Sequence, residues 1–384
     1  MNKKLTSLLL LLTFMLPVMA QNEDIVNRIS QIEKEFAPDK RVVVFDVKLL
    51  NDNDMLSLEG EVSCRRAFEK LEEMVSEKLK NNVRKLPDDV VGDKAFGIVY
   101  NSVGTLRRGA SYPSEIVTQT LMGAPVKVLD KKGGWTRIQL PDKYIGWING
   151  SVDFMTRDQQ KEYLCKPKII ITSLFGSSYS EADVSSSKVS DLVVGDVLAV
   201  DEVVGEFYKV IYADGRVGFV ARKDAESMDS WQPVQTKDAI VETSKTFMGI
   251  PYLWGGTSSK GLDCSGFSKT VYYMHNILLS RDASQQAMTG LLVDELGEFD
   301  KLEAGDLVFF GERATAEQPK ERVVHVGIYI GNYRFIHASD YIRVNSFDPS
   351  DELYDEFNTN RYLRTKRILG EDGFKSVDSV FVCD

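Results

Sequence analysis

One cysteine of this chain lies where a reactive thiol is expected. Cys264 follows the segment 249–256, in which a proline and a Gly-Gly pair exclude regular structure, and Asp263 can cap a helix that begins at the cysteine. Apolar residues then recur at the spacing of one helical face: Phe267, Val271 and Met274. A helix N-terminus carries positive partial charge that stabilises a thiolate, the nucleophilic form of cysteine. We therefore predict an activated nucleophile at Cys264, with a small buried cysteine of a core helix as the alternative.

A nucleophilic cysteine needs a base, which is usually a histidine. The chain has three: His275, His325 and His337. His275 would lie about 16 Å beyond the cysteine along the helix, so we expect it at the surface. The other two fall in β-rich runs that flank Gly331-Asn332. A three-residue hairpin loop at 330–332 would place them opposite each other, whereas a two-residue turn would put them on opposite faces. We predict the three-residue loop, with His325 as the base and His337 orienting it.

A carbonyl attacked by Cys264 becomes an oxyanion, which requires hydrogen-bond donors. Backbone N–H groups near the start of the helix can supply them, and we expect Tyr252 and Ser265 to support the same site. With His325 and His337, these residues would complete a site for acyl transfer through a covalent intermediate.

The remaining cysteines and histidines indicate neither a disulfide framework nor a metal site. Three cysteines are left over at wide, irregular spacing: Cys64, Cys165 and Cys383. No Cys-x-x-Cys or His-Glu-x-x-His motif is present, and two histidines without a third ligand make a poor zinc site. We therefore expect no metal and no cofactor.

Five motifs around these residues follow one another over about 90 residues. They are Tyr-Leu-Trp-Gly-Gly at 252–256, Leu-Asp-Cys-Ser-Gly-Phe at 262–267, Ala-Gly-Asp-Leu-Val-Phe-Phe at 304–310, His-Val-Gly-Ile-Tyr at 325–329 and Ile-His-Ala at 336–338. Together they resemble the NlpC/P60 cysteine peptidases of bacterial cell walls, over roughly residues 237–384. The resemblance implies a papain-like α+β core with a Cys-His-His triad. It also implies cleavage of peptidoglycan stem peptides between γ-D-glutamate and a diamino acid, either diaminopimelate or lysine.

Residues 1–20 have the pattern of a secretory signal peptide. A basic Asn2-Lys3-Lys4 precedes an apolar run at 8–16, and Val18-Met19-Ala20 predicts cleavage after Ala20. We expect an exported protein, periplasmic or secreted, because no later apolar run approaches the roughly 18 residues of a membrane span. An uncleaved anchor is the alternative.

Residues 21–93 are interpreted as a small α/β domain. We expect a helix at 24–36, a strand at 41–50 with a hairpin partner at 55–63, and a helix at 64–79. No pattern in this region indicates chemistry, and a spacer or packing role is our interpretation.

Residues 94–160 and 161–230 carry two copies of one unit. Each copy has a strand, an aromatic-led strand, an Asp-centred turn and a Gly-aromatic-aliphatic strand, as in Gly146-Trp147-Ile148 and Gly218-Phe219-Val220. The repeat predicts two small SH3-like β-barrels, which generally bind or position peptides. The predicted fold is therefore an α+β peptidase domain preceded by two barrels and a small α/β domain.

The same resemblance implies how a substrate amine would be held. Some NlpC/P60 enzymes with SH3-like domains upstream cut only short stem peptides that have a free N-terminal L-alanine. In that subgroup, acidic and tyrosine side chains of the first barrel and an aspartate of the catalytic domain bind the amine by charge-assisted hydrogen bonds. The resemblance implies Asp282 as the aspartate, Tyr144 and Glu115 as the barrel residues, and we add Asp263 as a substrate contact. The alternatives are a helix cap at Asp282, a packed tyrosine and a solvated glutamate.

Composition limits the partners of this chain. Its 384 residues carry a net charge of −10, which argues against nucleic acid and against electrostatic docking on an anionic surface. We expect a monomer, without stable membrane insertion, that binds peptidoglycan tripeptides or tetrapeptides. Two functions remain open: a cysteine endopeptidase that trims such peptides, or a non-catalytic wall-binding protein that uses its barrels. The complete Cys-His-His set favours the enzyme, and another reaction of the same fold, such as acyl transfer, is a weaker third possibility.

Overall fold

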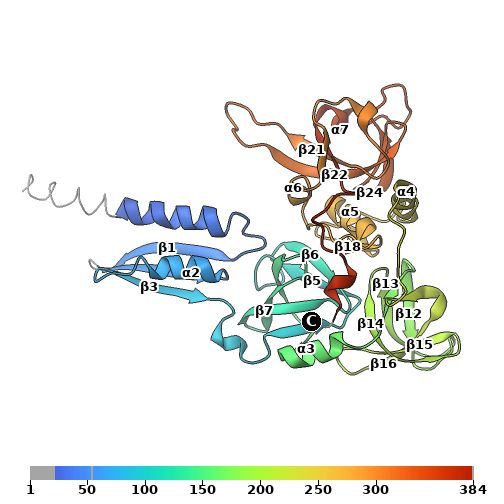
Figure 1. The fold of residues 1–384 in the computed structure, drawn as a ribbon, viewed down its shortest axis with the longest axis horizontal. Coiled ribbons are helices and arrows are strands. Elements are labelled where there is room, and N and C mark those ends of the chain that lie inside the picture. Colours follow the sequence, from blue (N-terminus) through green and yellow to red (C-terminus); the bar gives the residue numbers. More distant parts are fainter. Residues whose placement is uncertain (1–21, 53–54, 383–384) are drawn as a thin grey trace, which may run out of the picture. The chain divides into compact units, whose positions relative to one another are not determined.

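The computed structural model describes residues 22–52 and 55–382 (Figure 1). The expected signal segment lies outside these residues. Within them no helix is both long and apolar enough to cross a membrane. The chain forms two compact units: the first comprises the described residues up to Gly92 with Val128–Lys131 and Lys143–Ile145, and the second comprises the rest.

The first unit combines helices with a three-stranded sheet of order β1-β2-β3. Its elements are a helix at 22–36, β1 (Phe45–Asp52), β2 (Met55–Val62), α2 (Arg65–Glu72) and β3 (Leu79–Lys85). β1 and β2 form the predicted hairpin. β3 runs parallel to β2, and its first residue, Leu79, was expected to lie in a helix. The predicted helix at 64–79 is too long, since α2 ends at Glu72. Val75 and Leu79 are four residues apart, a spacing that fits one face of a helix and also one face of a strand, so the apolar pattern did not show where the helix ends. Val75 is exposed and Leu79 is buried.

Two seven-stranded sheets follow, and they confirm the internal repeat. The first contains β4 (Phe96–Val99), β5 (Val103–Arg107), β6 (Ile116–Leu121), β7 (Pro125–Lys132), β8 (Trp135–Gln139), β9 (Ile145–Ile148) and β10 (Val152–Met155). The second contains β11 (Lys168–Ile171), β12 (Phe175–Tyr179), β13 (Lys188–Val193), β14 (Val197–Val204), β15 (Phe207–Ile211), β16 (Val217–Ala221) and β17 (Ala225–Ser227). The strand order is β10-β4-β7-β8-β9-β5-β6 in one and, read in the same sense, β17-β11-β14-β15-β16-β12-β13 in the other. Each strand thus has a counterpart seven positions later, and α3 (Arg157–Leu164) joins the two copies.

The C-terminal part is a six-stranded sheet packed against helices. Its helices are α4 (Lys237–Thr246), α5 (Cys264–Tyr273), α6 (Ala283–Gln286) and α7 (Glu356–Asn360). Its sheet, of order β20-β25-β21-β22-β23-β24, contains β20 (Leu291–Asp294), β21 (Leu307–Glu312), β22 (Arg322–Gly331), β23 (Arg334–Ser339), β24 (Tyr341–Ser346) and β25 (Tyr362–Arg367). A short hairpin, β18 (Thr257–Ser258) and β19 (Gly261–Leu262), precedes α5.

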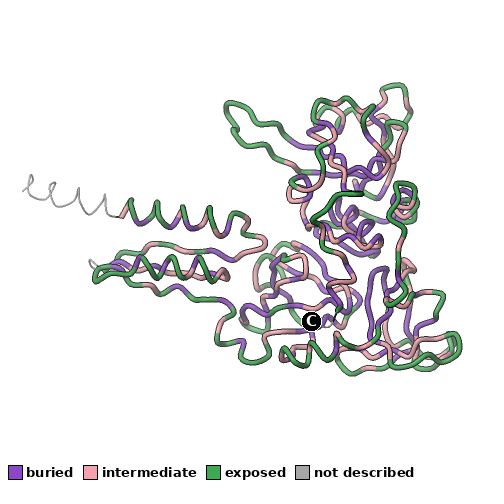
Figure 2. Tube along the Cα trace, in the orientation of Figure 1, coloured by how far each residue is buried: buried purple, intermediate pink, exposed green. Residues whose placement is uncertain are grey.

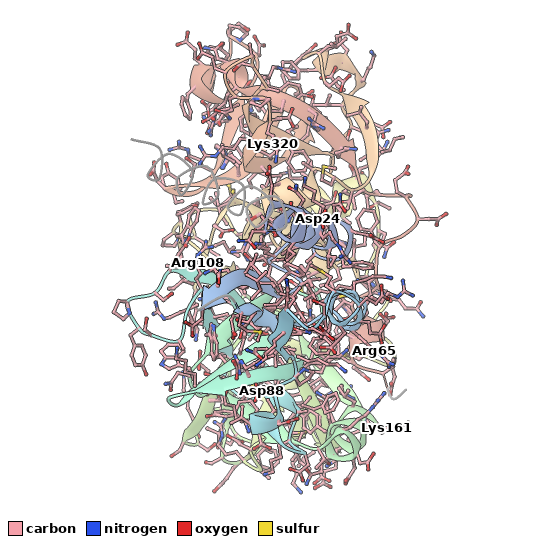
Figure 3. The ribbon with its side chains drawn as sticks, turned by 90° about the vertical axis from the view of Figure 1, so that its left-hand side faces the viewer. Asp24, Arg65, Asp88, Arg108, Lys161 and Lys320 are labelled. Atoms are coloured by element: carbon pink, nitrogen blue, oxygen red, sulfur yellow. The ribbon has the colours of Figure 1, made fainter. Side chains whose placement is uncertain are left out.

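Helix α5 is the centre of this domain. Phe267 and Val271 are fully buried and pack with Val326 and Ile328 of β22 and with Ile336 of β23. Figure 2 shows the helix in the buried class, while the connection between β21 and β22 is exposed. Lys320, labelled in Figure 3, lies in this charged connection. This packing holds the N-terminus of α5 against β22. The predicted nucleophile, Cys264, is the first residue of α5, and the predicted base, His325, lies on β22.

Candidate active site

The N-terminus of α5 is built as predicted, with Cys264 as its first residue and Asp263 as its N-cap. Asp263 Oδ1 accepts from the Gly266 N–H at 2.7 Å, and Oδ2 accepts from the Gly255 N–H at 3.0 Å. Gly266 has to be glycine because a Cβ there would lie 1.9 Å from the Gly256 carbonyl oxygen. The Gly-rich loop therefore folds closely over the first turn of the helix and fixes the position of the cysteine.

A buried arginine completes the support beneath Cys264. Arg281 is 2% exposed, and its guanidinium lies 2.5 Å from Asp263 Oδ2 and 3.0 Å from Oδ1. It also donates to Ser265 Oγ at 2.9 Å and to Thr118 Oγ1 of β6 at 2.8 Å. Internal donors thus occupy both oxygens of Asp263, which gives this residue a positioning role and does not support its predicted contact with substrate. Ser265 belongs to the same network.

The hairpin that carries the two histidines differs from the predicted three-residue loop. β22 pairs with β23 through Ile328–Ile336, Tyr329–Phe335 and Gly331–Arg334, with a bulge at Ile330. The turn is Asn332-Tyr333, both with positive φ, and the prediction of a loop at 330–332 is wrong. The bulge adds the residue that a two-residue turn lacks. It therefore keeps His325 and His337 on one face, as diagonal rather than directly opposite neighbours.

The two imidazoles are nevertheless in contact. His325 Nε2 lies 2.8 Å from His337 Nδ1, and His337 Nε2 lies 2.8 Å from Asn345 Oδ1 on β24. Gly327 leaves the room for this contact, because a Cβ there would lie 3.3 Å from the His337 Cβ. His337 is fully buried, and His325 is 8% exposed. Rigid packing therefore holds both rings, with the Phe335 ring centroid 4.9 Å from that of His337.

The cysteine meets this pair through the backbone of β22. The N–H of Val326, the residue after His325, hydrogen-bonds the Cys264 thiol and lowers its pKa, as do the Ser265 N–H and the charge of Arg281. Burial, followed by the charge of Asp263, outweighs them and raises the pKa of Cys264 to about 12. Burial of the sulfur thus opposes the thiolate that the helix N-terminus was expected to stabilise.

The histidines are neutral for the same physical reason. Burial lowers the pKa of His325 well below its ordinary 6.5, and the neighbouring His337, Arg361 and Arg343 lower it further. Burial lowers the pKa of His337 to about 4, although the hydrogen bond to Asn345 acts in the opposite direction. At neutral pH the site thus holds a protonated thiol and two uncharged imidazoles, so transfer of the proton from sulfur to nitrogen requires charge to develop on the substrate.

Tyr252 lies beside the thiol, as expected. Burial raises the pKa of its phenol above the ordinary 10, and Cys264 and Asp263 add to this effect. Its hydroxyl is therefore protonated at neutral pH and can donate a hydrogen bond. The Tyr252 N–H donates to the Asp340 carbonyl at 2.8 Å, which fixes the loop on which the ring sits.

Strand β6 of the first barrel lies along the loop that leads to Cys264. Gln119 Oε1 accepts from the Thr257 N–H at 3.0 Å and from Ser258 Oγ at 3.1 Å. Just before this strand, Glu115 Oε1 accepts from Trp254 Nε1 at 3.0 Å. Glu115 is exposed and also pairs with Arg108, labelled in Figure 3, at 2.8 Å. The structure thus brings Glu115 to the loop that carries Tyr252, two residues from Trp254.

Of the other two predicted amine ligands, Asp282 caps a helix and Tyr144 is buried. Asp282 is half-buried at the N-cap of α6 and forms a capping box with Gln285, whose Oε1 accepts from the Asp282 N–H at 3.0 Å. It directly follows Arg281 in the chain. Tyr144 is 6% exposed. A substrate role for either stays a prediction.

Two expectations about other residues are corrected. His275 is 4% exposed rather than on the surface, because its ring nitrogens lie 2.6 Å from the Val234 carbonyl oxygen and 2.8 Å from Thr243 Oγ1. It ties the segment that enters the domain to α4. Cys165 is disulfide-bonded, whereas Cys64 and Cys264 are free thiols, so wide spacing did not exclude a disulfide.

Comparison with known proteins agrees with this geometry. Residues 249–367 match the NlpC/P60 family, and residues 106–151 match the bacterial dipeptidyl-peptidase SH3 domain. A gamma-D-glutamyl-L-lysine dipeptidyl-peptidase of Bacillus cereus is 30% identical over 241 residues, which are 59% of this chain and 68% of that protein. The chain belongs to the NlpC/P60 family of cysteine peptidases.

Other relatives of this NlpC/P60 protein share more than the peptidase domain. A gamma-D-glutamyl-L-lysine dipeptidyl-peptidase of Bacillus subtilis is 29% identical over 240 residues, covering 60% of this chain and 75% of that protein. The crystal structure of an NlpC/P60 family protein from Bacillus cereus superposes with a TM-score of 0.59 at 24% identity, over 71% of this chain and 99% of the other. The two proteins therefore share the fold of the peptidase domain and of the region that precedes it.

Sequence reasoning missed several residues of the NlpC/P60 site. Ile342 and Val344 alternate along β24, so the sequence places Asn345 on the opposite face of the strand. Only the pairing of β24 with β23 shows that this face brings Asn345 to His337. Arg281 stands beside Asp282 in the sequence and was not considered, since nothing local indicates a buried ion pair with Asp263. Contacts across domains, such as Gln119 with Thr257, have no sequence signal of their own.

Proposed function

We propose that this protein is an exported cysteine endopeptidase that hydrolyses the γ-D-glutamyl–diamino acid bond of peptidoglycan stem peptides. The observation that carries the proposal is the 2.8 Å contact of His325 with His337, on the strand whose Val326 backbone meets the Cys264 thiol. The names of the relatives, gamma-D-glutamyl-L-lysine dipeptidyl-peptidases, support the choice of bond. The proposal covers both diaminopimelate and lysine as the diamino acid.

The reaction begins with a protonated Cys264 thiol and a neutral His325 imidazole. As the Cys264 sulfur attacks the γ-carbonyl carbon of D-glutamate, its proton moves to His325, and a tetrahedral oxyanion forms. Tyr252 and backbone N–H groups near the helix start donate to that oxyanion. The His325 imidazolium then protonates the leaving amine of the diamino acid as the C–N bond breaks, which leaves a thioester on Cys264. Water, deprotonated by His325, hydrolyses the thioester and returns the thiol.

We include export in the proposal. The residues at 1–20 have the composition of a signal peptide, and the disulfide at Cys165 is typical of proteins that leave a reducing compartment. A free N-terminal L-alanine on the substrate is also part of the proposal. The carboxylate of Glu115, which is exposed and accepts from Trp254 on the loop that carries Tyr252, supports it, because a carboxylate favours an ammonium over an acylated nitrogen. Asp282 and Tyr144 are further candidates for the same amine.

Mass spectrometry tests both the bond and the amine. The mature protein is incubated with L-Ala-γ-D-Glu-diaminopimelate and, separately, with the same peptide acetylated at its N-terminus. We expect L-Ala-γ-D-Glu to be released from the free peptide only. Release from both peptides would contradict the requirement for an amine but retain the peptidase. Binding of the free peptide without any release would contradict the peptidase and favour a wall-binding protein.

A further inference from the structure

Asn345 lies at the far end of the histidine pair and has two partners of different kinds. Its Oδ1 is 2.8 Å from His337 Nε2, and its Nδ2 donates to the Leu353 carbonyl oxygen at 3.1 Å. A carbonyl oxygen can only accept a hydrogen bond, so the amide nitrogen has to face Leu353. The amide oxygen therefore faces His337, and the orientation of this side chain is determined by its surroundings.

That orientation decides where every proton of the pair resides. Since Asn345 Oδ1 only accepts, His337 Nε2 carries a hydrogen, and in a neutral imidazole Nδ1 then lacks one. His337 Nδ1 accordingly accepts from His325 Nε2, over 2.8 Å. The second ring nitrogen of His325, Nδ1, is left without a hydrogen. It is the atom of this pair that can receive the proton of a thiol.

The carbonyl that orients Asn345 is itself held in place. The Leu353 oxygen also accepts from the Ser346 N–H at 2.9 Å, and the Leu353 N–H donates to Asp351 Oδ1 at 3.1 Å. Asp351 is in turn paired with Arg334 of β23 at 2.7 Å. The segment between β24 and α7 thus forms a fixed acceptor above the asparagine, anchored on the strand that carries His337.

We propose that Asn345 is a positioning residue that sets the tautomers of both histidines and so makes His325 Nδ1 the base. This proposal rests on the proposed peptidase function. An asparagine suits the position because it accepts from His337 and donates to Leu353 at once, which neither a carboxylate nor an aliphatic side chain can do. It does so without adding charge to a pair that already faces Arg343 from β24, and Arg361 and Asp355 from the ends of α7. Arg361 also interacts with Cys264 of α5.

The direct test is nitrogen-15 NMR of histidine-labelled protein, which is tractable because the chain has three histidines. We expect His325 and His337 of the wild type to be protonated at Nε2 and not at Nδ1. In Asn345→Leu, His337 should populate both tautomers, while His275 keeps its own spectrum. A wild-type His337 protonated at Nδ1, or unchanged tautomers in Asn345→Leu, would overturn the proposal. This readout needs no turnover, so it remains decisive even if the peptidase proposal fails.

Kinetics supply a second measurement. Asn345→Leu should lower kcat by about tenfold to a hundredfold with little change in KM, as expected when the orientation of a reacting group is lost. Asn101→Leu, an exposed asparagine of the first barrel, is the control and should retain full activity. In Asn345→Asp the added carboxylate favours the imidazolium, so the acid limb of the kcat/KM profile should move to higher pH. Wild-type kcat in Asn345→Leu, or an unmoved acid limb in Asn345→Asp, would contradict the assigned role.

Discussion

The Cys264 thiol and the His325 imidazole are both uncharged at neutral pH, because burial raises the pKa of the former to about 12 and lowers that of the latter well below 6.5. A preformed thiolate–imidazolium pair would need the opposite shifts. The unliganded site therefore stores its proton on sulfur. The developing negative charge on the substrate carbonyl oxygen, stabilised by hydrogen-bond donors, makes the transfer favourable.

Alkylation of Cys264 tests this protonation state. Only the thiolate reacts, and burial raises the pKa of the Cys264 thiol. The rate of inactivation by iodoacetamide without substrate should therefore keep increasing with pH above 8. The rate is measured from residual activity between pH 5 and 10. A plateau of fast alkylation between pH 5 and 8 would show a resting thiolate and contradict the shift. The free thiol Cys64, followed by mass spectrometry of its peptide, reports the behaviour of a second unpaired cysteine in the same sample.

His337 should make the protein less stable in acid. Its pKa is about 4 in the folded state against 6.5 in the unfolded chain, so the unfolded state binds more protons between these values and the free energy of unfolding falls as pH falls through this window. The loss attributable to His337 is about 3 kcal/mol at pH 4 relative to pH 7. In urea unfolding, His337→Asn should show a correspondingly smaller difference between pH 7 and pH 4. An equal pH dependence in wild type and variant would refute a buried neutral His337.

At the scale of elements, the bulge in β22 and Gly327 bring the two histidines together, which the turn alone would not do. The two-residue turn at Asn332-Tyr333 would point His325 and His337 to opposite faces, and the bulge at Ile330 restores their common face. Gly327 then allows the diagonal approach of the rings. The geometry of the pair is therefore a property of the hairpin, and not of the two histidines.

Gly327→Ala tests this role. The added Cβ would lie 3.2 Å from the Phe335 ring and 3.3 Å from the His337 Cβ, so His337 has to shift by a few tenths of an ångström. We expect kcat to fall about tenfold with KM nearly unchanged, because misplaced catalytic groups lose rate before binding. Gly176→Ala on β12 is the matched control, since its Cβ would make an ordinary contact at 3.5 Å and should leave activity intact. Full activity in Gly327→Ala would show that the approach is not restricted.

Elements with a local cause were predictable from the sequence, and those with a distant cause were not. Asp263 caps the turn that it precedes, so the start of α5 at Cys264 followed from neighbouring residues. The repeat of the barrels followed from self-similarity of the chain. The bulge at Ile330 depends on pairing with β23, and the ion pair of Arg281 with Asp263 depends on a loop 18 residues away. His275 was misjudged because its hydrogen-bond partner, the Val234 carbonyl oxygen, lies 41 residues earlier.

At the scale of the whole molecule, the first barrel is part of the peptidase site. Thr118 and Gln119 on β6 contact Arg281 and the Thr257 loop, which lie on either side of Cys264 in the sequence. Gly255, with φ of 80°, allows this approach, because a Cβ there would lie 2.5 Å from the Ile116 side chain. The second barrel has the same strand order and also reaches this loop, where Ser259 Oγ donates to the Leu174 carbonyl oxygen and Lys260 pairs with Asp191. The contact with the buried Arg281, however, comes from Thr118 of the first barrel.

Glu115→Gln tests the contribution of the first barrel. Loss of its charge should lower kcat/KM for the peptide with a free L-alanine amine by about tenfold, while the rate for the N-acetylated peptide does not fall, since only the ammonium is attracted to a carboxylate. Glu206→Gln, an exposed glutamate of the second barrel, should leave both rates unchanged. Equal effects of the two substitutions, or a parallel loss for both peptides, would remove Glu115 from amine recognition.

The central claim is that hydrolysis passes through a thioester on Cys264, and acid-quench mass spectrometry tests it most directly. The protein is mixed with L-Ala-γ-D-Glu-diaminopimelate, quenched within one turnover, digested and mapped. We predict that the peptide containing Cys264 gains the mass of an L-Ala-γ-D-Glu acyl group, that the adduct decays as product appears, and that Cys264→Ala forms neither adduct nor product while still binding the substrate. Product release that persists in Cys264→Ala, or turnover without an adduct on the wild-type cysteine at any quench time, would contradict the account.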